Sequence, residues 1–226
     1  MLATLHSPRS MLAIFAHARR LFLLSSYGTN SMNDPIPLAD DAMDRYAAGD
    51  NAAFGDVYDA LAPRLHRYLL RLTRYDSARA EDLLQQTFLQ IHDARGRFHT
   101  GSAVAPWAYA IARRLFIDSA RRNSREDLSG TYEEIVGHTL STGPTPEADL
   151  EAHRLAEDLR QAIASLPPQQ REAFLLVRDE GLSMAEAAEV LGTTVAGVKL
   201  RASRAYKALR ALFAYVGRDV TEEKAS

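Results

Sequence analysis

Helical periodicity runs through most of the 226-residue chain, and no other sequence feature limits its fold as strongly. Apolar residues recur every three or four positions, whereas alternating runs of β-branched residues and Asn-Gly or Asp-Gly turns are absent. We therefore expect an all-α protein. The pattern predicts helices over residues 41–48, 51–73, 77–95 and 106–123, and again beyond residue 151.

A stretch rich in Ser, Thr, Gly and Pro divides this helical pattern into two parts. It covers residues 123–150 and includes the run Ser141–Pro146. Such a composition buries little apolar surface and predicts a flexible linker. We expect two small helical domains on this tether, with a leader before the first and a tail after the second: residues 1–40 (leader), 41–122, 123–150 (linker), 151–217 and 218–226 (tail).

Composition narrows the possible classes of function. Lys and Arg total 27 against 29 Asp and Glu, so the net charge is −2. This balance excludes a uniformly basic nucleic-acid wrapper but leaves room for local basic patches. The chain has no cysteine, which excludes disulfides, thiolate metal sites and cysteine nucleophiles and is compatible with a reducing compartment. No apolar run approaches the roughly 18 residues of a membrane span, so we expect no membrane insertion.

The first forty residues differ from the rest of the chain. They hold three arginines and no acid before Asp34. Their apolar runs are shorter than the roughly 7–15 residues of a secretory signal core. We interpret this segment as a flexible leader, and translation could start at either Met1 or Met32.

The C-terminal half carries the pattern of a helix-turn-helix. Ser183 and Glu186 have the spacing of a capping box at the start of a short helix. Gly192 follows that helix at the position where a left-handed residue is most easily accommodated. Either of the two threonines after this glycine can cap a second helix, and four residues of that helix are expected to face inward: Val195, Val198, Ala202 and Leu209.

Basic residues dominate this second helix. Six Lys and Arg lie between Gly192 and Arg218, the latter included, and no acid accompanies them. Such side chains can neutralise phosphates and reach base edges in the major groove, so the pattern favours duplex DNA as a ligand. A helical hairpin with a solvated basic face is the alternative. The predicted DNA contacts are Thr194, Ala196, Gly197, Lys199, Leu200, Arg201, Ser203, Arg204 and Lys207.

One predicted helix of the first domain has two distinct faces. Its apolar face, with Ala80, Leu84, Phe88 and Ile91, should lie in the core. The opposite face combines acids and amides with an exposed leucine, which suits a partly basic protein partner. An ordinary solvated face is the alternative. The predicted partner contacts are Asp82, Gln85, Gln86, Leu89 and Asp93.

Aromatic and basic residues gather at the end of the first domain. A loop over residues 97–105 precedes a helix that opens at Pro106 and is apolar on both sides, as expected of a helix between neighbours. Aromatic and basic groups together could hold unstacked bases of a melted strand. Asp118 is expected to be a structural acid paired with a nearby arginine. The predicted single-strand contacts are Phe98, His99, Thr100, Trp107, Arg113, Arg114 and Arg121.

Three segments together resemble the extracytoplasmic-function (ECF) sigma factors, the minimal sigma-70 group that has only regions 2 and 4. Residues 80–88 (AEDLLQQTF) resemble the part of region 2 that binds RNA polymerase. Residues 107–118 (WAYAIARRLFID) resemble the segment that recognises the promoter −10 element. Residues 166–174 (LPPQQREAF), with those from Gly181 onward, resemble region 4, which reads the −35 element.

This resemblance implies a cytoplasmic protein that binds core RNA polymerase and promoter DNA, helps to open the −10 region, and has an anti-sigma factor as a further partner. It implies neither a cofactor nor catalysis. The residues agree, because the adjacent acid pairs and the histidine spacings form no acid–base dyad and no metal site, so we predict no catalytic and no metal-binding residue. Two alternatives are a sigma-like decoy for an anti-sigma factor and a stand-alone helix-turn-helix regulator.

Overall fold

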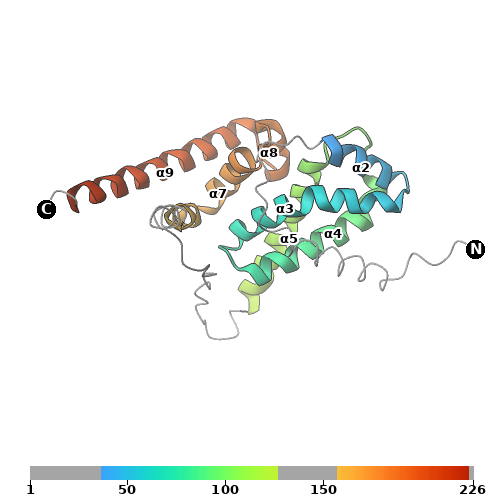
Figure 1. Cartoon of the computed structure of the whole chain (residues 1–226), viewed down its shortest axis with the longest axis horizontal. Helices are drawn as coiled ribbons and strands as arrows, with labels where there is room; N and C mark the ends of the chain where they lie inside the picture. The colour runs from blue at the N-terminus through green and yellow to red at the C-terminus, as the bar shows by residue number, and fades with distance from the viewer. Residues whose placement is uncertain (1–36, 127–156, 224–226) are drawn as a thin grey trace, which may run out of the picture.

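The structure is a computed structural model that describes residues 37–126 and 157–223. Within these ranges all regular secondary structure is helical, which confirms the expected all-α class (Figure 1). The predicted leader up to residue 36, the linker from residue 127 onward and the start of the second domain up to residue 156 lie outside the described residues.

The N-terminal unit is a bundle of four α-helices with two short 3-10 segments. Its elements are α2 (Pro37–Ala47), η1 (Asn51–Ala53), α3 (Phe54–Leu72), α4 (Ser77–Ala94), η2 (Arg95–Arg97) and α5 (Val104–Glu126). Two helices begin earlier than the sequence pattern predicts. Pro37 suits the first turn of α2. In α5 the amide of Val104 donates to Asp40 Oδ1 at 2.7 Å. This bond satisfies one of the free N–H groups at the start of the helix, so α5 can begin two residues before Pro106.

Aromatic and aliphatic side chains fill the core of this bundle. Phe88 of α4 is fully buried, and its ring centroid lies 4.5 Å from that of Tyr58 on α3. Tyr68 of α3 meets Tyr109 of α5 edge to face at 5.2 Å. The predicted core face of α4 is confirmed, since Phe88 and its three predicted companions are all buried. This burial fixes α4 and α5 so that their other faces point outward.

The C-terminal unit consists of the helical residues 157–165 and four named elements. These are α7 (Pro168–Phe174), the π-helical segment η4 (Leu175–Asp179), α8 (Met184–Leu191) and α9 (Val195–Glu223). The apolar spacing of residues 169–180 predicts one uninterrupted helix, and the structure changes to π-helical pairing over Leu175–Asp179. Helix α9 continues through Gly217, because one glycine costs a helix only about 1 kcal/mol.

Local signals position α8 and α9. The Ser183 hydroxyl accepts from the Glu186 amide at 3.2 Å, and the Ser183 amide donates to the Glu186 carboxylate at 2.8 Å, so the capping box is confirmed. Gly192 ends α8 in the left-handed conformation with φ 60°. Thr194 is the residue that caps α9, since its hydroxyl accepts from the Gly197 amide at 3.1 Å.

Val195 departs from the predicted inward face of α9. It is 39% exposed, whereas Val198 and Leu209 are buried and Ala202 is half-buried. The physical reason is its position as the first residue of α9, where its neighbours Thr194 and Ala196 are exposed as well. The apolar stripe that packs against α8 therefore begins at Val198.

Candidate nucleic-acid interface

Helix α9 presents an exposed face that combines basic, hydroxyl and apolar groups. Leu200 is 52% exposed and stands beside the exposed Lys199. An apolar side chain next to a cation can contact a thymine methyl while the cation pairs with a phosphate. Seven of the nine predicted contacts are exposed on or beside this helix: Thr194, Ala196, Lys199, Leu200, Ser203, Arg204 and Lys207.

Two predicted contacts of α9 are half-buried. Arg201 is one of them, and Gly197 is the other. A Cβ at Gly197 would meet Thr193 Oγ1 at 2.9 Å, so the absent side chain lets the first turn of α9 approach the preceding turn closely. Gly197 thus has a packing role whether or not it touches DNA.

The sequence pattern did not identify Tyr206, whose side chain is 56% exposed. It lies on α9 at helical spacing from Lys199 and Ser203, which puts all three on one face. An exposed aromatic ring with a hydroxyl can pack on a sugar or donate to a phosphate. The signal was present in the spacing, and Arg210, also exposed, extends the same face.

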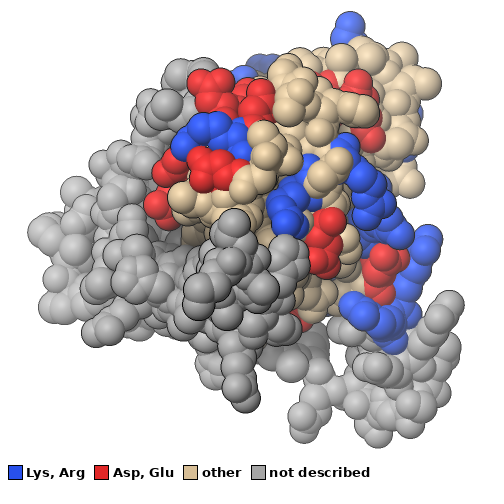
Figure 2. All heavy atoms as spheres, turned by 90° about the vertical axis from the view of Figure 1, so that its right-hand side faces the viewer, with Lys and Arg blue, Asp and Glu red and all other residues tan. Residues whose placement is uncertain are grey.

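The outer face of α4 is exposed, polar and acidic, with one leucine. Leu89 is 45% exposed, and its neighbours Asp82, Gln85 and Asp93 are exposed as well. Gln86 is half-buried and donates to Asp82 Oδ2 at 2.7 Å. The structure therefore brings together all five residues that were predicted to contact a protein partner. Seen from the α2 side, basic and acidic side chains lie beside one another (Figure 2).

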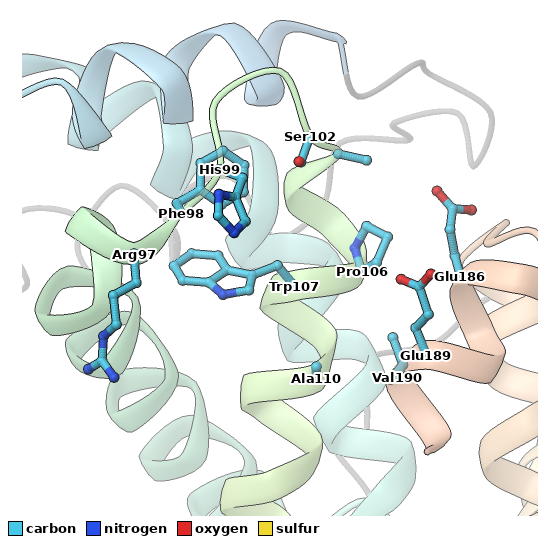
Figure 3. Close-up of a pocket in the computed structure, with 11 residues that line it drawn as sticks. Arg97, Phe98, His99, Ser102, Pro106, Trp107, Ala110, Glu186, Glu189 and Val190 are labelled. Atoms are coloured by element: carbon cyan, nitrogen blue, oxygen red, sulfur yellow. The ribbon is translucent and has the colours of Figure 1, made fainter. Parts of the chain in front are cut away.

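The loop before α5 packs its aromatic residue inward. Phe98 is buried, with its ring centroid 5.1 Å from that of Trp107, while His99 and Thr100 are exposed. Figure 3 shows His99 beside the indole of Trp107 at the mouth of a cavity. The ring of Phe98 supports this indole in the present arrangement and is not itself open to a base.

This cavity has a second wall that the sequence pattern did not reveal. Its volume is about 370 Å³, and one side is formed by Glu186, Glu189 and Val190 of α8 (Figure 3). The cavity therefore lies between the N-terminal bundle and the helix-turn-helix. The α8 carboxylates give this wall a negative charge.

The predicted arginines of α5 have different environments. Arg114 and Arg121 are exposed, and Arg114 Nε lies 3.9 Å from Asp118 Oδ2, in keeping with the predicted structural role of that acid. Arg113 is half-buried instead, and its Nε donates to Glu172 Oε2 at 2.8 Å. Arg113 is thus engaged with the C-terminal unit in this arrangement.

The two units also meet at a buried carboxylate. The side chain of Glu180 has no exposed surface, and it accepts a hydrogen bond from the hydroxyl of Tyr109. Arg64 Nε lies 3.5 Å from the same carboxylate. Burial raises the pKa of Tyr109 well above its usual value, and the charge of Glu180 adds to the rise. No local sequence signal indicates this contact, since its partners come from distant parts of the chain.

The part of the chain that the structure describes holds no group of three or more His, Asp or Glu arranged to bind a metal ion. In the same ranges, no helix combines the length and the apolar character needed to cross a membrane. What these residues offer is binding surface: a basic helix face, an acidic helix face, and an aromatic site between the units.

Comparison with known families gives two matches within the chain. The family described as "Sigma-70 region 2" matches residues 57–126. The family described as "Sigma-70, region 4" matches residues 156–209. These ranges contain the outer face of α4, helix α5 and the first half of α9.

Similar proteins carry sigma factor names. RNA polymerase sigma factor CarQ from Myxococcus xanthus is 34% identical over 170 residues, which span 75% of this chain and 94% of the relative. The ECF RNA polymerase sigma factor EcfG from Rhodopseudomonas palustris is 36% identical over 155 residues, or 68% of this chain and 81% of the relative.

A solved structure shares the fold. The sigma factor RpoE from Bartonella quintana, crystallised with the anti-sigma factor NepR, aligns with a TM-score of 0.60 and 27% identity over 71% of this chain and 96% of its own. CnrH in complex with the cytosolic domain of CnrY has a TM-score of 0.57 at 24% identity and covers 79% of this chain and 99% of its own, which shows the fold alone.

Proposed function

The chain belongs to the ECF group of sigma-70 factors, and from this premise we propose which of its surfaces perform each step of transcription initiation. It directs core RNA polymerase to specific promoters and helps to open their −10 region. Residues 41–122 serve polymerase and −10 binding, and residues 151–217 serve −35 binding. The observation that carries the proposal is the exposed basic face of α9, held by the capped turn of α8.

Helix α9 is suited to the −35 major groove. A second helix after a tight turn is the usual reading element of a helix-turn-helix. Lys199, Arg204 and Lys207 can neutralise phosphates, which contributes affinity but little specificity. Leu200 and Ser203 project between these cations on the exposed face and are the candidates for contacts to base edges.

The outer face of α4 is suited to core polymerase. Leu89 supplies an exposed apolar anchor, and the surrounding acids and amides give it a polar rim. Interfaces of this kind concentrate their binding energy in a few central side chains. The negative charge of this face would repel promoter DNA, which separates protein binding from DNA binding on the bundle.

Helix α5 and its preceding loop are suited to unpaired −10 bases. The indole of Trp107 is half-buried on Phe98, so it is rigid enough to stack with a base. His99 lies beside it (Figure 3), and the exposed Arg114 and Arg121 lie further along α5, where they can pair with phosphates. Such a site shifts the promoter toward the melted state because it binds that state better than duplex DNA.

No covalent step belongs to this mechanism. The protein contributes binding energy and geometry, while polymerase carries out the chemistry. We assign it to the cytoplasm, where polymerase and chromosome lie. An anti-sigma factor is a partner by analogy with the complex of the Bartonella quintana sigma factor.

Transcription with purified core polymerase tests this function. Core enzyme, the chain and genomic fragments of the source organism should yield discrete transcripts that disappear when the chain is omitted. Changing Lys199 and Arg204 to Ala should lower the yield roughly tenfold while polymerase binding persists, since each lost contact is worth on the order of 1 kcal/mol or more. The matched control is Arg178→Ala, an exposed arginine of the same unit away from α9.

Three outcomes would contradict the proposal. Polymerase binding without any chain-dependent transcript would indicate a decoy. A shift of duplex DNA by the free chain, again without transcripts, would indicate a stand-alone regulator. Equal transcript yields from the α9 variant and the control would remove α9 as the reading element.

A further inference from the structure

We propose that the free chain forms a closed state, in which three carboxylates of the C-terminal unit bind arginines of the N-terminal bundle and keep the −10 surface covered until polymerase separates the units. The closed contact stands on the geometry alone. Its inhibitory consequence rests on the proposed function. The contact, called the latch below, consists of Glu172, Asp179 and Glu180 on one side and Arg64, Arg67, Arg71, Arg113 and Tyr109 on the other.

Glu180 is the centre of the latch. Its carboxylate has no exposed surface, and it lies 3.5 Å from Arg64 Nε and 3.7 Å from Arg67 Nε. The Tyr109 hydroxyl donates to Glu180 Oε2, and the Arg64 guanidinium donates to the Glu180 backbone carbonyl. A buried carboxylate is costly unless partners compensate its lost hydration, and here Oε2 accepts from Tyr109 whereas Oε1 has only the nearby charge of Arg67. The partners all come from the other unit, so separation would return this carboxylate to water.

Two outer ion pairs flank this centre. Arg71 donates to Asp179, and these side chains are 20% and 14% exposed. Arg113 pairs with Glu172 at 2.8 Å, and here the exposed fractions are 23% and 10%. Burial raises the pKa of Asp179 even though Arg71 opposes the rise. Shielding from water strengthens the attraction within each pair, while the lost hydration of the charges opposes it, so the pairs mainly fix how the units meet.

The charges of the latch are divided between the units without mixing. All its arginines come from α3 and α5, whereas all its carboxylates come from α7, η4 and the residue after η4. The three arginines of α3 are spaced at 64, 67 and 71, which places them on one helix face. The buried apolar residues of the two units belong to one continuous cluster, and α5 packs against α8, so apolar contact accompanies the charge pairs. Contacts between domains of one chain commonly open as a unit, so this one can open while the helices of each unit stay intact.

Closure covers the candidate −10 surface in two ways. Glu172 occupies Arg113, one of the predicted contacts to the melted strand. Helix α8 walls the cavity beside Trp107 with Glu186 and Glu189, as Figure 3 shows. Nucleic acid approaching from that side would meet carboxylates where it needs cations. Opening the latch would free Arg113 and remove this wall at the same time.

Distance measurements on the free full-length chain test the closed contact. The chain has no cysteine, so dyes can be attached at Gln90→Cys on α4 and Ala211→Cys on α9, both exposed positions. We expect high energy transfer at low salt that falls as salt is added. The double variant Glu172→Gln with Glu180→Gln should show low transfer at all salt concentrations. The control is Asp158→Asn, an exposed acid of the same unit, which should behave like the parent chain.

Exchanging the charges of Arg113 and Glu172 provides a second test of the contact in case the double Gln variant does not fold. Arg113→Glu alone should lower the energy transfer, and its combination with Glu172→Arg should restore it, because only a direct pair can be rescued in this way. Circular dichroism should show the same helix content in every variant. Low transfer in the parent chain at low salt, or the absence of rescue, would overturn the closed contact.

Binding of single-stranded DNA tests the inhibitory consequence. The probe is a dye-labelled single-stranded oligonucleotide of promoter non-template sequence, added to the free chain. Glu172→Gln with Glu180→Gln should bind it roughly tenfold more tightly, which a shift of about 1.4 kcal/mol in the closing equilibrium would produce. Unchanged binding by a variant that shows low energy transfer would overturn the inhibitory role. Failure of chain-dependent transcription would instead count against the proposed function, with the distance result unaffected.

Discussion

The hydroxyl of Tyr109, near the start of α5, donates to the carboxylate of Glu180, the residue after the π-helical segment η4, and both side chains are buried. These two residues lie on opposite sides of the segment that separates the two helical units in sequence. Because a phenol and a carboxylate are each costly to bury without a partner, their pairing couples the units energetically.

Replacing Tyr109 by Phe should therefore weaken the protein measurably. The change removes the donor but keeps the ring, so a buried acceptor loses a partner at a cost of about 1–3 kcal/mol. Urea unfolding followed by circular dichroism would measure the loss. Tyr206→Phe is the matched control, because that ring is exposed on α9 and its hydroxyl is solvated. Equal midpoints for the two variants would contradict the coupling.

The elements of this fold could be predicted where their signals are local. The capping box joins Ser183 to a residue three positions on, and Gly192 needs only its own backbone to adopt φ 60°. The faces of α4 and α9 follow from the helical repeat in the same way. These signals were sufficient to locate the helix-turn-helix and the exposed outer face of α4.

The contacts between the units could not be predicted, because they depend on packing across a long sequence separation. The sequence pattern predicts Arg113 as a cation available to nucleic acid, but in the structure it is paired with Glu172. Phe98 reads as an open aromatic residue, but it is buried under Trp107. A residue can be assigned to an exposed face from periodicity, whereas its partner from a distant element requires the tertiary structure.

Ser183→Ala should destabilise the C-terminal unit. The serine hydroxyl accepts from the Glu186 amide at 3.2 Å, and loss of such a cap costs about 1 kcal/mol. Thermal unfolding should show a lower midpoint for this variant. Ser203→Ala, in the exposed middle of α9, should leave the midpoint unchanged or raise it slightly, because alanine favours a helix interior. A larger loss from Ser203→Ala than from Ser183→Ala would exclude the capping explanation.

Gly197→Ala should be destabilising although alanine is the better helix former. The new Cβ would lie 2.9 Å from Thr193 Oγ1, so the Thr193 side chain must move in the turn before α9. The gain of about 1 kcal/mol in helix propensity should reappear once the clash is removed in the double variant with Thr193→Ala. A double-mutant cycle of unfolding free energies measures this coupling. A coupling energy near zero would show that the turn adapts without cost.

Alkaline pH should destabilise the N-terminal bundle through Tyr46. Burial raises the pKa of Tyr46 from 10.0 to about 12, with Arg95 opposing the rise, and the hydroxyl is hydrogen-bonded to His92. Between these values the unfolded chain loses the phenolic proton while the folded protein keeps it. Stability from this group is therefore complete below pH 10 and declines as the pH rises toward 12.

The Tyr46→Phe variant isolates this effect. Unfolding free energies measured from pH 9 to 12 should fall more steeply for the parent chain than for the variant, and phenolate absorbance should show one fewer late-titrating tyrosine. Parallel pH profiles for the two proteins would assign the alkaline loss to other groups.

Leu89→Ala should weaken capture of core polymerase without affecting the fold. Leu89 is 45% exposed at the centre of the outer face of α4, so its truncation removes an apolar anchor but leaves no cavity in the core. A central anchor is worth on the order of 1–2 kcal/mol, and we expect roughly tenfold weaker binding. Titration of labelled chain with core enzyme measures the affinity. Gln90→Ala, the exposed neighbour on the same helix, should bind like the parent, and an equally weak Gln90→Ala variant would place the partner surface elsewhere on α4.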